Sequence, residues 1–215
     1  MKKLTIAITI STLICPSVQA YDWQKHVPDE AKQYIPSNVS NKSGTTNGST
    51  KHYGPISIQG TTQDSLVSHG PATIIDSIIT TFTSYGPAKV TNSKIKLIDI
   101  HGPFSGDNVE LHAGEVKGVF TLTNSKITGS FEIKGLVKIT KTQISKDIVI
   151  YSSSVTFVDT NIHENVYIYS DTKIPKVSLT NTFIDGKIIF VQKAGKIISD
   201  GKSKINGDTK QDQKR

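Results

Sequence analysis

Three acidic residues, Asp99, Glu115 and Glu132, recur at intervals of 16 and 17 residues. If they lie on neighbouring parallel strands, their carboxylates stack roughly 4.8 Å apart, and the repulsion between them can raise a carboxyl pKa. Paired carboxylates at roughly 5–9 Å are also the groups that hydrolyse glycosidic bonds. The three acids are therefore the candidate catalytic residues of a polysaccharide-degrading enzyme. The same ladder is equally typical of a solvated strand face.

A second group of residues suits binding rather than catalysis. Apolar and aromatic residues continue the series of the acids, and others follow two positions later, at places where solvent is expected. Exposed clusters of this kind typically mark an interface, and aromatic faces also stack on sugar rings. Two lysines nearby add positive charge. The predicted binding residues are Val149, Tyr151, Tyr167, Tyr169, Ile189, Val191, Lys146 and Lys187.

Metal and thiol chemistry are not expected. His69 and His101 hold equivalent positions in the repeat described below, but Tyr85 stands between them. Two repeats are roughly 9.6 Å apart, far beyond the roughly 2.1 Å of a metal–ligand bond. The chain has one cysteine, Cys15, and it lies in a segment predicted to be removed. We therefore expect no metal site and no cofactor.

The spacing of all these residues follows an internal repeat. The tripeptide Tyr53-Gly54-Pro55 recurs as His69-Gly70-Pro71, Tyr85-Gly86-Pro87 and His101-Gly102-Pro103, each 16 residues after the last. A second marker, the pentapeptide that begins at Thr91, returns at Thr123, 32 residues later. Two phased markers identify a repeat architecture.

Each repeat predicts three short strands. Apolar residues two positions apart indicate a strand with alternate side chains inward, and the odd offsets between these pairs indicate corners. One corner carries Asn92, Asn108, Asn124, Asp159 and Asn181, residue types that tolerate the left-handed backbone conformation. About eight coils of 16–18 residues, over residues 53–191, are thus predicted to stack. The predicted fold is all-β: a single-domain, three-sheet parallel β-helix (β-solenoid) with a short N-terminal helix.

The coils resemble those of β-helix proteins in general. Over residues 53–191 their length and their Val/Ile columns are similar to those of bactofilin-type polymer-forming solenoids. The resemblance identifies no specific family. Bactofilins are cytoplasmic, whereas this chain carries the export signal described next. Left-handed hexapeptide acyltransferases fit less well, because their six-residue spacing is missing from this sequence.

The N-terminus has the three parts of a secretory signal peptide. Lys2 and Lys3 precede an apolar run from Leu4 to Ile14, and small or apolar residues precede a cleavage position after Ala20. The run is too short to span a bilayer. Residues 1–20 are therefore predicted to direct the protein to the periplasm or the cell exterior. Acylation of Cys15, as in a lipoprotein, is the alternative.

Shorter segments flank the predicted solenoid. Residues 21–36 are predicted to form an amphipathic helix, and residues 37–52, rich in Ser, Asn, Gly and Thr, a flexible linker. The helix is predicted to cap the first coil or, alternatively, to contact a partner or a membrane surface. In a further alternative, this helix or an insertion near residues 171–176 covers the predicted binding residues. Residues 192–207 are predicted to form a degraded capping coil, and residues 208–215 a disordered tail.

Charge is distributed unevenly along the chain. Residues 21–116 carry 7 basic and 9 acidic side chains, whereas residues 117–215 carry 16 and 9. A basic half beside an apolar stripe favours an anionic glycan, an envelope component or a protein partner, and a homo-oligomer is also possible. Arg215 is the single arginine, which makes nucleic acid an unlikely partner. We therefore expect an exported, non-enzymatic binding or structural module, with the polysaccharide-degrading enzyme as the alternative.

Overall fold

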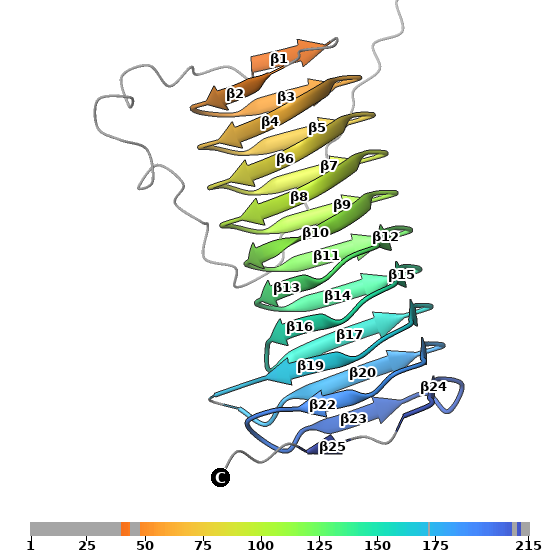
Figure 1. Ribbon diagram of the computed structural model, residues 1–215. Helices are drawn as coiled ribbons and strands as arrows, with labels where there is room; N and C mark the ends of the chain where they lie inside the picture. The colour runs from red at the N-terminus through yellow and green to blue at the C-terminus, as the bar shows by residue number, and fades with distance from the viewer. Residues whose placement is uncertain (1–39, 44–47, 172, 208–209, 212–215) are drawn as a thin grey trace, which may run out of the picture.

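A computed structural model describes residues 40–43, 48–171, 173–207 and 210–211 of the chain. These residues form a parallel β-solenoid of about 9 turns, and none of them is helical. Figure 1 shows the coils stacked as the rungs of a rod, from β1 at one end to β25 at the other. The predicted all-β solenoid is confirmed. The signal peptide and the predicted helix over 21–36 lie outside the described residues.

One sheet of ten strands forms the first face of the rod, and its strands follow one another coil by coil. In order they are β1 (Ser40–Ser43), β3 (Ile56–Gln59), β5 (Ala72–Ile75), β7 (Ala88–Thr91), β9 (Phe104–Asp107), β11 (Phe120–Thr123), β14 (Val137–Thr140), β17 (Ser154–Val158), β20 (Lys176–Thr180) and β23 (Lys196–Ser199).

A second sheet of fifteen strands forms the other two faces. In the first five coils it consists of β2 (Ser49–His52), β4 (Thr62–Ser68), β6 (Ile78–Ser84), β8 (Lys94–Ile100) and β10 (Glu110–Lys117). Later coils split into short strands on the second face, which are β12 (Lys126–Ile127), β15 (Gln143–Ile144), β18 (Asn161–Ile162), β21 (Phe183–Ile184) and β24 (Lys204–Ile205). Their third-face partners are β13 (Phe131–Lys134), β16 (Ile148–Tyr151), β19 (Val166–Tyr169), β22 (Ile188–Phe190) and β25 (Lys210–Gln211).

The number of sheets is thus two rather than the predicted three. Strands β4, β6, β8 and β10 contain seven or eight residues each and run without a break from the second face to the third. From β12 onward the two faces are separate, because residues 128–130 interrupt the strand between Ile127 and Phe131. Strand β10 pairs with both β12 and β13, so the two faces form a single hydrogen-bonded sheet.

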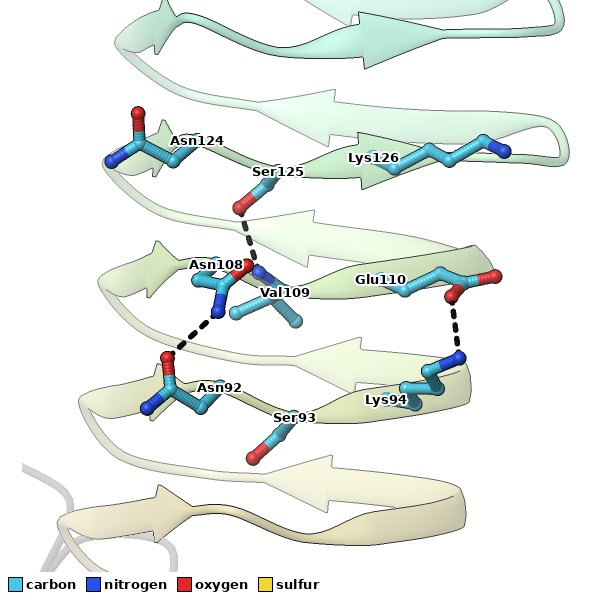
Figure 2. A pocket seen from close by; sticks show the side chains of 9 residues that line it. All are labelled: Asn92, Ser93, Lys94, Asn108, Val109, Glu110, Asn124, Ser125 and Lys126. Atoms are coloured by element: carbon cyan, nitrogen blue, oxygen red, sulfur yellow. Dashed lines mark hydrogen bonds and ion pairs between the residues drawn. The ribbon is translucent and has the colours of Figure 1, made fainter.

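The corner between the first and second faces has the predicted left-handed residues. Asn92, Asn108 and Asn124 have φ angles of 49°, 53° and 50°. Asp76, Lys141, Asp159 and Asn181 adopt the same conformation in their coils. Figure 2 shows the three asparagines on successive coils, with the Asn108 amide donating to the Asn92 side-chain oxygen at 2.9 Å.

A ladder of buried hydroxyl groups lies just inside this corner. The Ser93 Oγ accepts a hydrogen bond from the Ser77 backbone N–H at 3.0 Å and donates to the Thr91 carbonyl at 2.7 Å. The Ser125 Oγ accepts in the same way from the Val109 N–H at 2.9 Å. These hydroxyls satisfy backbone donors that would otherwise be buried without a partner.

The corner between the third and first faces is tighter in the first coils. A Cβ added to Gly70 would lie 2.5 Å from the Gly54 carbonyl oxygen, and one added to Gly118 would lie 2.4 Å from that of Gly102. Glycine is therefore required at these positions because the backbones of successive coils approach too closely for a side chain. Beside this glycine column the rings of Tyr53, His69, Tyr85 and His101 stack with centroids 4.7–5.1 Å apart.

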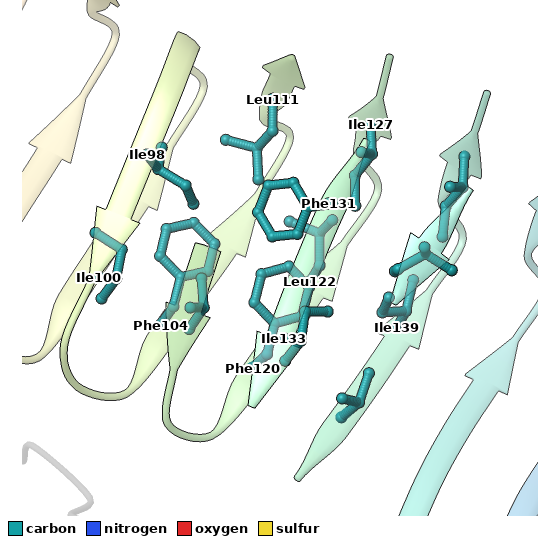
Figure 3. Packing of buried hydrophobic residues seen from close by; sticks show 14 of the residues in the cluster. Ile98, Ile100, Phe104, Leu111, Phe120, Leu122, Ile127, Phe131, Ile133 and Ile139 are labelled. Atoms are coloured by element: carbon teal, nitrogen blue, oxygen red, sulfur yellow. The ribbon is translucent and has the colours of Figure 1, made fainter. Parts of the chain in front are cut away.

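The core is a continuous column of apolar side chains, shown for the middle coils in Figure 3. The predicted inward residues are buried in every coil; Ile74, Leu122 and Ile139, for example, have no exposed surface. Gly106 interrupts one column because Phe104 and Phe120 stack beside it at 5.4 Å, and an added Cβ would lie 2.7 Å from Leu122 Cδ1.

Both ends of the solenoid extend beyond the predicted coils. Strands β1 and β2 lie within residues 37–52, where the sequence predicts a linker, and they pair with β3 and β4. At the other end β23 and β24 lie in the predicted capping coil, and β25 lies in the predicted tail. Polar composition hid β1, β2 and β25, each of which pairs with a strand on one side only. Among the described residues no helix is long and apolar enough to cross a membrane.

Candidate functional site

The predicted apolar stripe lies on three consecutive coils of the third face. The backbone register pairs Val149 with Tyr167 and Tyr167 with Ile189. All three side chains are half-buried and point away from the core. Tyr151 and Tyr169 adjoin them at the corner, with their rings stacked at 4.7 Å. We call Val149, Tyr167 and Ile189 the apolar stripe.

Neither face of the Tyr151 ring is available for a ligand. Tyr169 covers one face, and the Lys134 ammonium lies 5.3 Å from the ring centroid on the neighbouring coil. Burial, followed by the charge of Glu132, raises the pKa of the Tyr151 hydroxyl. Tyr151 is nevertheless 40% exposed, so it presents its edge and hydroxyl group to solvent. Stacking of a sugar on this ring is therefore excluded, whereas hydrogen bonding to it is not.

A cavity of about 240 Å³ opens at the same corner. Its lining consists of Tyr151, Ser152, Ser153, Tyr169, Ser170, Asp171 and Gln192. The glycine column of the earlier coils ends at Gly135, and serine occupies the equivalent places after Tyr151 and Tyr169. In the strand register Lys134 pairs with Tyr151 and Val137 with Val155, so the connection to the first face lengthens from two residues to three. The corner is wider in these coils because it no longer follows the glycine geometry.

The two predicted lysines lie at the opposite end of these strands. Lys146 Nζ is 2.7 Å from Glu164 Oε1, and this hydrogen bond raises the pKa of the lysine. The Lys187 backbone N–H donates to the Asn165 side-chain oxygen at 3.1 Å. The structure therefore does not bring Lys146 and Lys187 to the tyrosine corner, and the charge of Lys146 is neutralised by its partner.

The three candidate catalytic acids do lie on neighbouring strands, in the predicted register. Each, however, has a basic partner at 2.7–3.3 Å: His101 for Asp99, Lys117 and Lys134 for Glu115, and Lys134 for Glu132. The hydrogen bond from Lys134 is the main cause that lowers the pKa of Glu115, and the pKa of Lys134 is raised in return. A general acid needs a raised carboxyl pKa, so this ion-pair cluster favours a structural role for Glu115.

A second groove follows the asparagine corner and has a volume of about 330 Å³. Figure 2 shows the asparagine column on one side and Lys94, Glu110 and Lys126 on the other. Lys94 Nζ lies 3.1 Å from Glu110 Oε2, so these two charges are paired. The sequence predicts the asparagine column but not the groove, whose second wall depends on side chains from the next strand.

One polar pair was not found by sequence reasoning. His163 Nδ1 lies 3.1 Å from Asp185 Oδ2 on the next coil. The other ring nitrogen, Nε2, faces the Gln143 amide at 3.3 Å rather than a hydroxyl nucleophile. Their spacing of 22 residues departs from the 16-residue repeat, so the pairing was hidden in the sequence. Within the described part of the chain no group of three or more His, Cys, Asp or Glu side chains is arranged to hold a metal ion.

A scan against protein-family models, a search of curated proteins and a search of solved structures each found no match to this chain. The candidate site therefore rests on the geometry of the chain's own residues.

Proposed function

We propose that this protein is an exported, non-enzymatic β-solenoid that acts as a binding module at the bacterial envelope or outside the cell. It would contact a glycan component of the envelope through the C-terminal part of its third face. The observation that carries the proposal is that the apolar stripe and the open tyrosine corner occur together on the same three coils. Elsewhere on this face, the corresponding positions in the middle coils carry Asp99, beside His101, and the ion-paired Glu115 and Glu132.

The ion-paired acids make the enzyme alternative the weaker one. Glu115 lies between two lysines, and its lowered pKa keeps the carboxylate ionised at the pH where an acid catalyst must hold a proton. Hydrolysis or elimination would therefore require the Lys117 and Lys134 contacts to break first. A binding role needs no such rearrangement.

Coverage of the stripe by the protein's own N-terminal segment would be partial at most. A helix over residues 21–36 would be about 24 Å long, and three connecting residues add about 10 Å before β1. The stripe lies six to eight coils beyond β2, a distance of about 30–40 Å along the rod. A helix of that length tethered at β1 would reach the first two coils of the stripe, at Val149 and Tyr167, but not Ile189 at about 38 Å. Self-association through the stripe remains the second candidate, because a flat apolar sheet face suits a copy of itself.

Substitution of the central stripe residue tests the proposal. We expect Tyr167→Ser to weaken binding of the purified protein to glycans on an array by about 30-fold, the effect of losing a central aromatic contact. Val67→Ser is the matched control, since Val67 holds the same third-face position on β4 and is also half-buried. Unchanged binding with Tyr167→Ser would contradict the proposal.

Three further measurements separate the alternatives. Sedimentation velocity would reveal an oligomer that Tyr167→Ser dissociates, which would replace glycan binding by self-association. Polysaccharide cleavage that Glu115→Gln abolishes would replace it by the enzyme. Export is tested by N-terminal sequencing of the protein from periplasmic and culture fractions, where a chain beginning at Tyr21 is expected.

A further inference from the structure

The tyrosine corner, where Tyr151 and Tyr169 lie between the third and first faces, lacks the close backbone packing of the earlier coils. In the earlier coils the glycine column leaves no room even for a Cβ, because backbones approach within 2.1–2.8 Å of its position. At Ser152 and Ser170 the glycines are lost, and the connection between β19 and β20 comprises residues 170–175. A repeat protein departs from its own packing rules mainly where function requires it.

The hydroxyl groups of the two corner serines, Ser152 and Ser170, are already hydrogen-bonded to the backbone. The Ser152 Oγ donates to the Ser154 carbonyl at 2.9 Å and accepts from the Ser154 N–H at 3.1 Å. The Ser170 Oγ donates to the Lys173 carbonyl at 2.9 Å, and Lys193 Nζ donates to the Asp171 carbonyl. These bonds fix the backbone around the cavity before any ligand arrives.

Other polar groups that line the cavity make no hydrogen bond or ion pair among the described residues. Within the described part of the chain, no hydrogen bond or ion pair involves the Asp171 carboxylate, the Gln192 amide or the Ser153 hydroxyl. The Tyr151 and Tyr169 rings stack on each other and so offer their edges and hydroxyls. The cavity thus combines a carboxylate, an amide and hydroxyl groups with the edges of two aromatic rings.

The polar groups of the cavity favour a neutral ligand that carries hydroxyl groups. Hydroxyl groups of a sugar donate to a carboxylate and exchange hydrogen bonds with an amide, whereas an anionic group would be repelled by Asp171. Among the described residues, those that line the cavity include no lysine and no arginine. Its volume of about 240 Å³ lies below the roughly 300–1,000 Å³ of pockets for drug-sized ligands, so one monosaccharide unit is the appropriate size.

We propose that the corner cavity is a subsite for one uncharged sugar residue of a glycan, held by Asp171 and Gln192 and contacted by the edges of Tyr151 and Tyr169. The inference rests on the proposed glycan-binding function and specifies it. The glycan is neutral at this unit, in contrast to the anionic partner that the net charge of the C-terminal half suggests. Its adjoining part would lie along the apolar stripe.

The test uses the purified protein on an array of neutral oligosaccharides (glucans, mannans, galactans and N-acetylglucosamine oligomers) and anionic ones (uronates and sulfated glycans). We expect neutral glycans to bind, and Asp171→Ala and Gln192→Ala each to weaken this binding about tenfold, because each removes hydrogen bonds to the sugar. Asp64→Ala is the matched control, an exposed carboxylate on β4, and should leave binding unchanged. Ser153→Tyr, which fills the cavity, should abolish binding.

Three results would overturn the subsite: no bound glycan, binding confined to anionic glycans, or neutral binding that survives both alanine substitutions. Circular dichroism of each variant confirms that the solenoid is intact. If Tyr167→Ser abolishes glycan binding while Asp171→Ala retains it, the subsite fails and the proposed function stands. If neither variant affects a bound glycan, both fail.

Discussion

The two halves of the corner between the third and first faces solve the same packing problem differently. From Gly54 to Gly135 the backbones of successive coils touch, the rings of Tyr53 to His101 stack beside them, and no side chain fits between. At Ser152 and Ser170 hydroxyl-to-backbone bonds replace the glycine contacts, and a cavity opens. Hydroxyl bonds from Ser68 and Ser84 to the Gly70 and Gly86 carbonyls support the first half as well, but only the second half leaves space and polar groups available to a ligand.

The largest effect is expected from a side chain in the glycine column. Gly118→Ala would place a Cβ 2.4 Å from the Gly102 carbonyl oxygen, a backbone atom that cannot move without shifting the coil. Overpacking of this kind costs about 2–3 kcal/mol of unfolding free energy, or about 5 °C or more in the midpoint of thermal unfolding. Ser152→Ala, in the wide corner, should cost no more than about 1 kcal/mol. Equal losses in thermal unfolding would remove the distinction between the halves.

An intermediate effect is expected at the hydroxyl ladder, which both halves share. Ser93→Ala leaves the Ser77 N–H without the acceptor that it has at 3.0 Å. The buried unpaired donor should lower the unfolding free energy by about 1–2 kcal/mol, as measured by thermal denaturation. Ser105→Ala, at an exposed outward position on β9, is the control and should change stability little. If Ser93→Ala leaves the unfolding free energy unchanged, the hydroxyl ladder does not contribute to stability.

The smallest effect is expected where the two halves meet, at the ion-pair cluster of Glu115, Lys117 and Lys134. Because the folded-state pKa of Glu115 lies below its usual value of 4.5, its contribution to stability is present above that value and is lost as pH falls through the folded pKa. Solvent screening limits the contribution to a few tenths of a kcal/mol. Glu115→Gln should therefore be slightly less stable at pH 7 and equal to the wild type near pH 3. A difference that persists at low pH would show that the ion pairs are not its cause.

The repeat in the sequence predicts the coil, the apolar columns and the left-handed corner. A regular repeat permits this because each residue's neighbours are those one period away, so the columns of Ile74 and Leu122 or the stack of Tyr53 and His69 follow from counting. It also determined that Tyr167 and Ile189 would be neighbours. These inferences needed the backbone register and no side-chain conformation.

Features that depend on insertions and on side-chain rotamers do not follow from the repeat and are seen only in the folded protein. The second and third faces form one sheet because β10 continues through the corner between them. The cavity at Ser152 depends on the extra residues that widen the corner between the third and first faces. Lys134 contacts both Glu115 and the ring of Tyr151, which turns a predicted catalytic ladder into an ion-pair cluster and a predicted stacking platform into a covered one. Long flexible side chains choose among several neighbours of similar distance, so a period alone cannot specify these contacts.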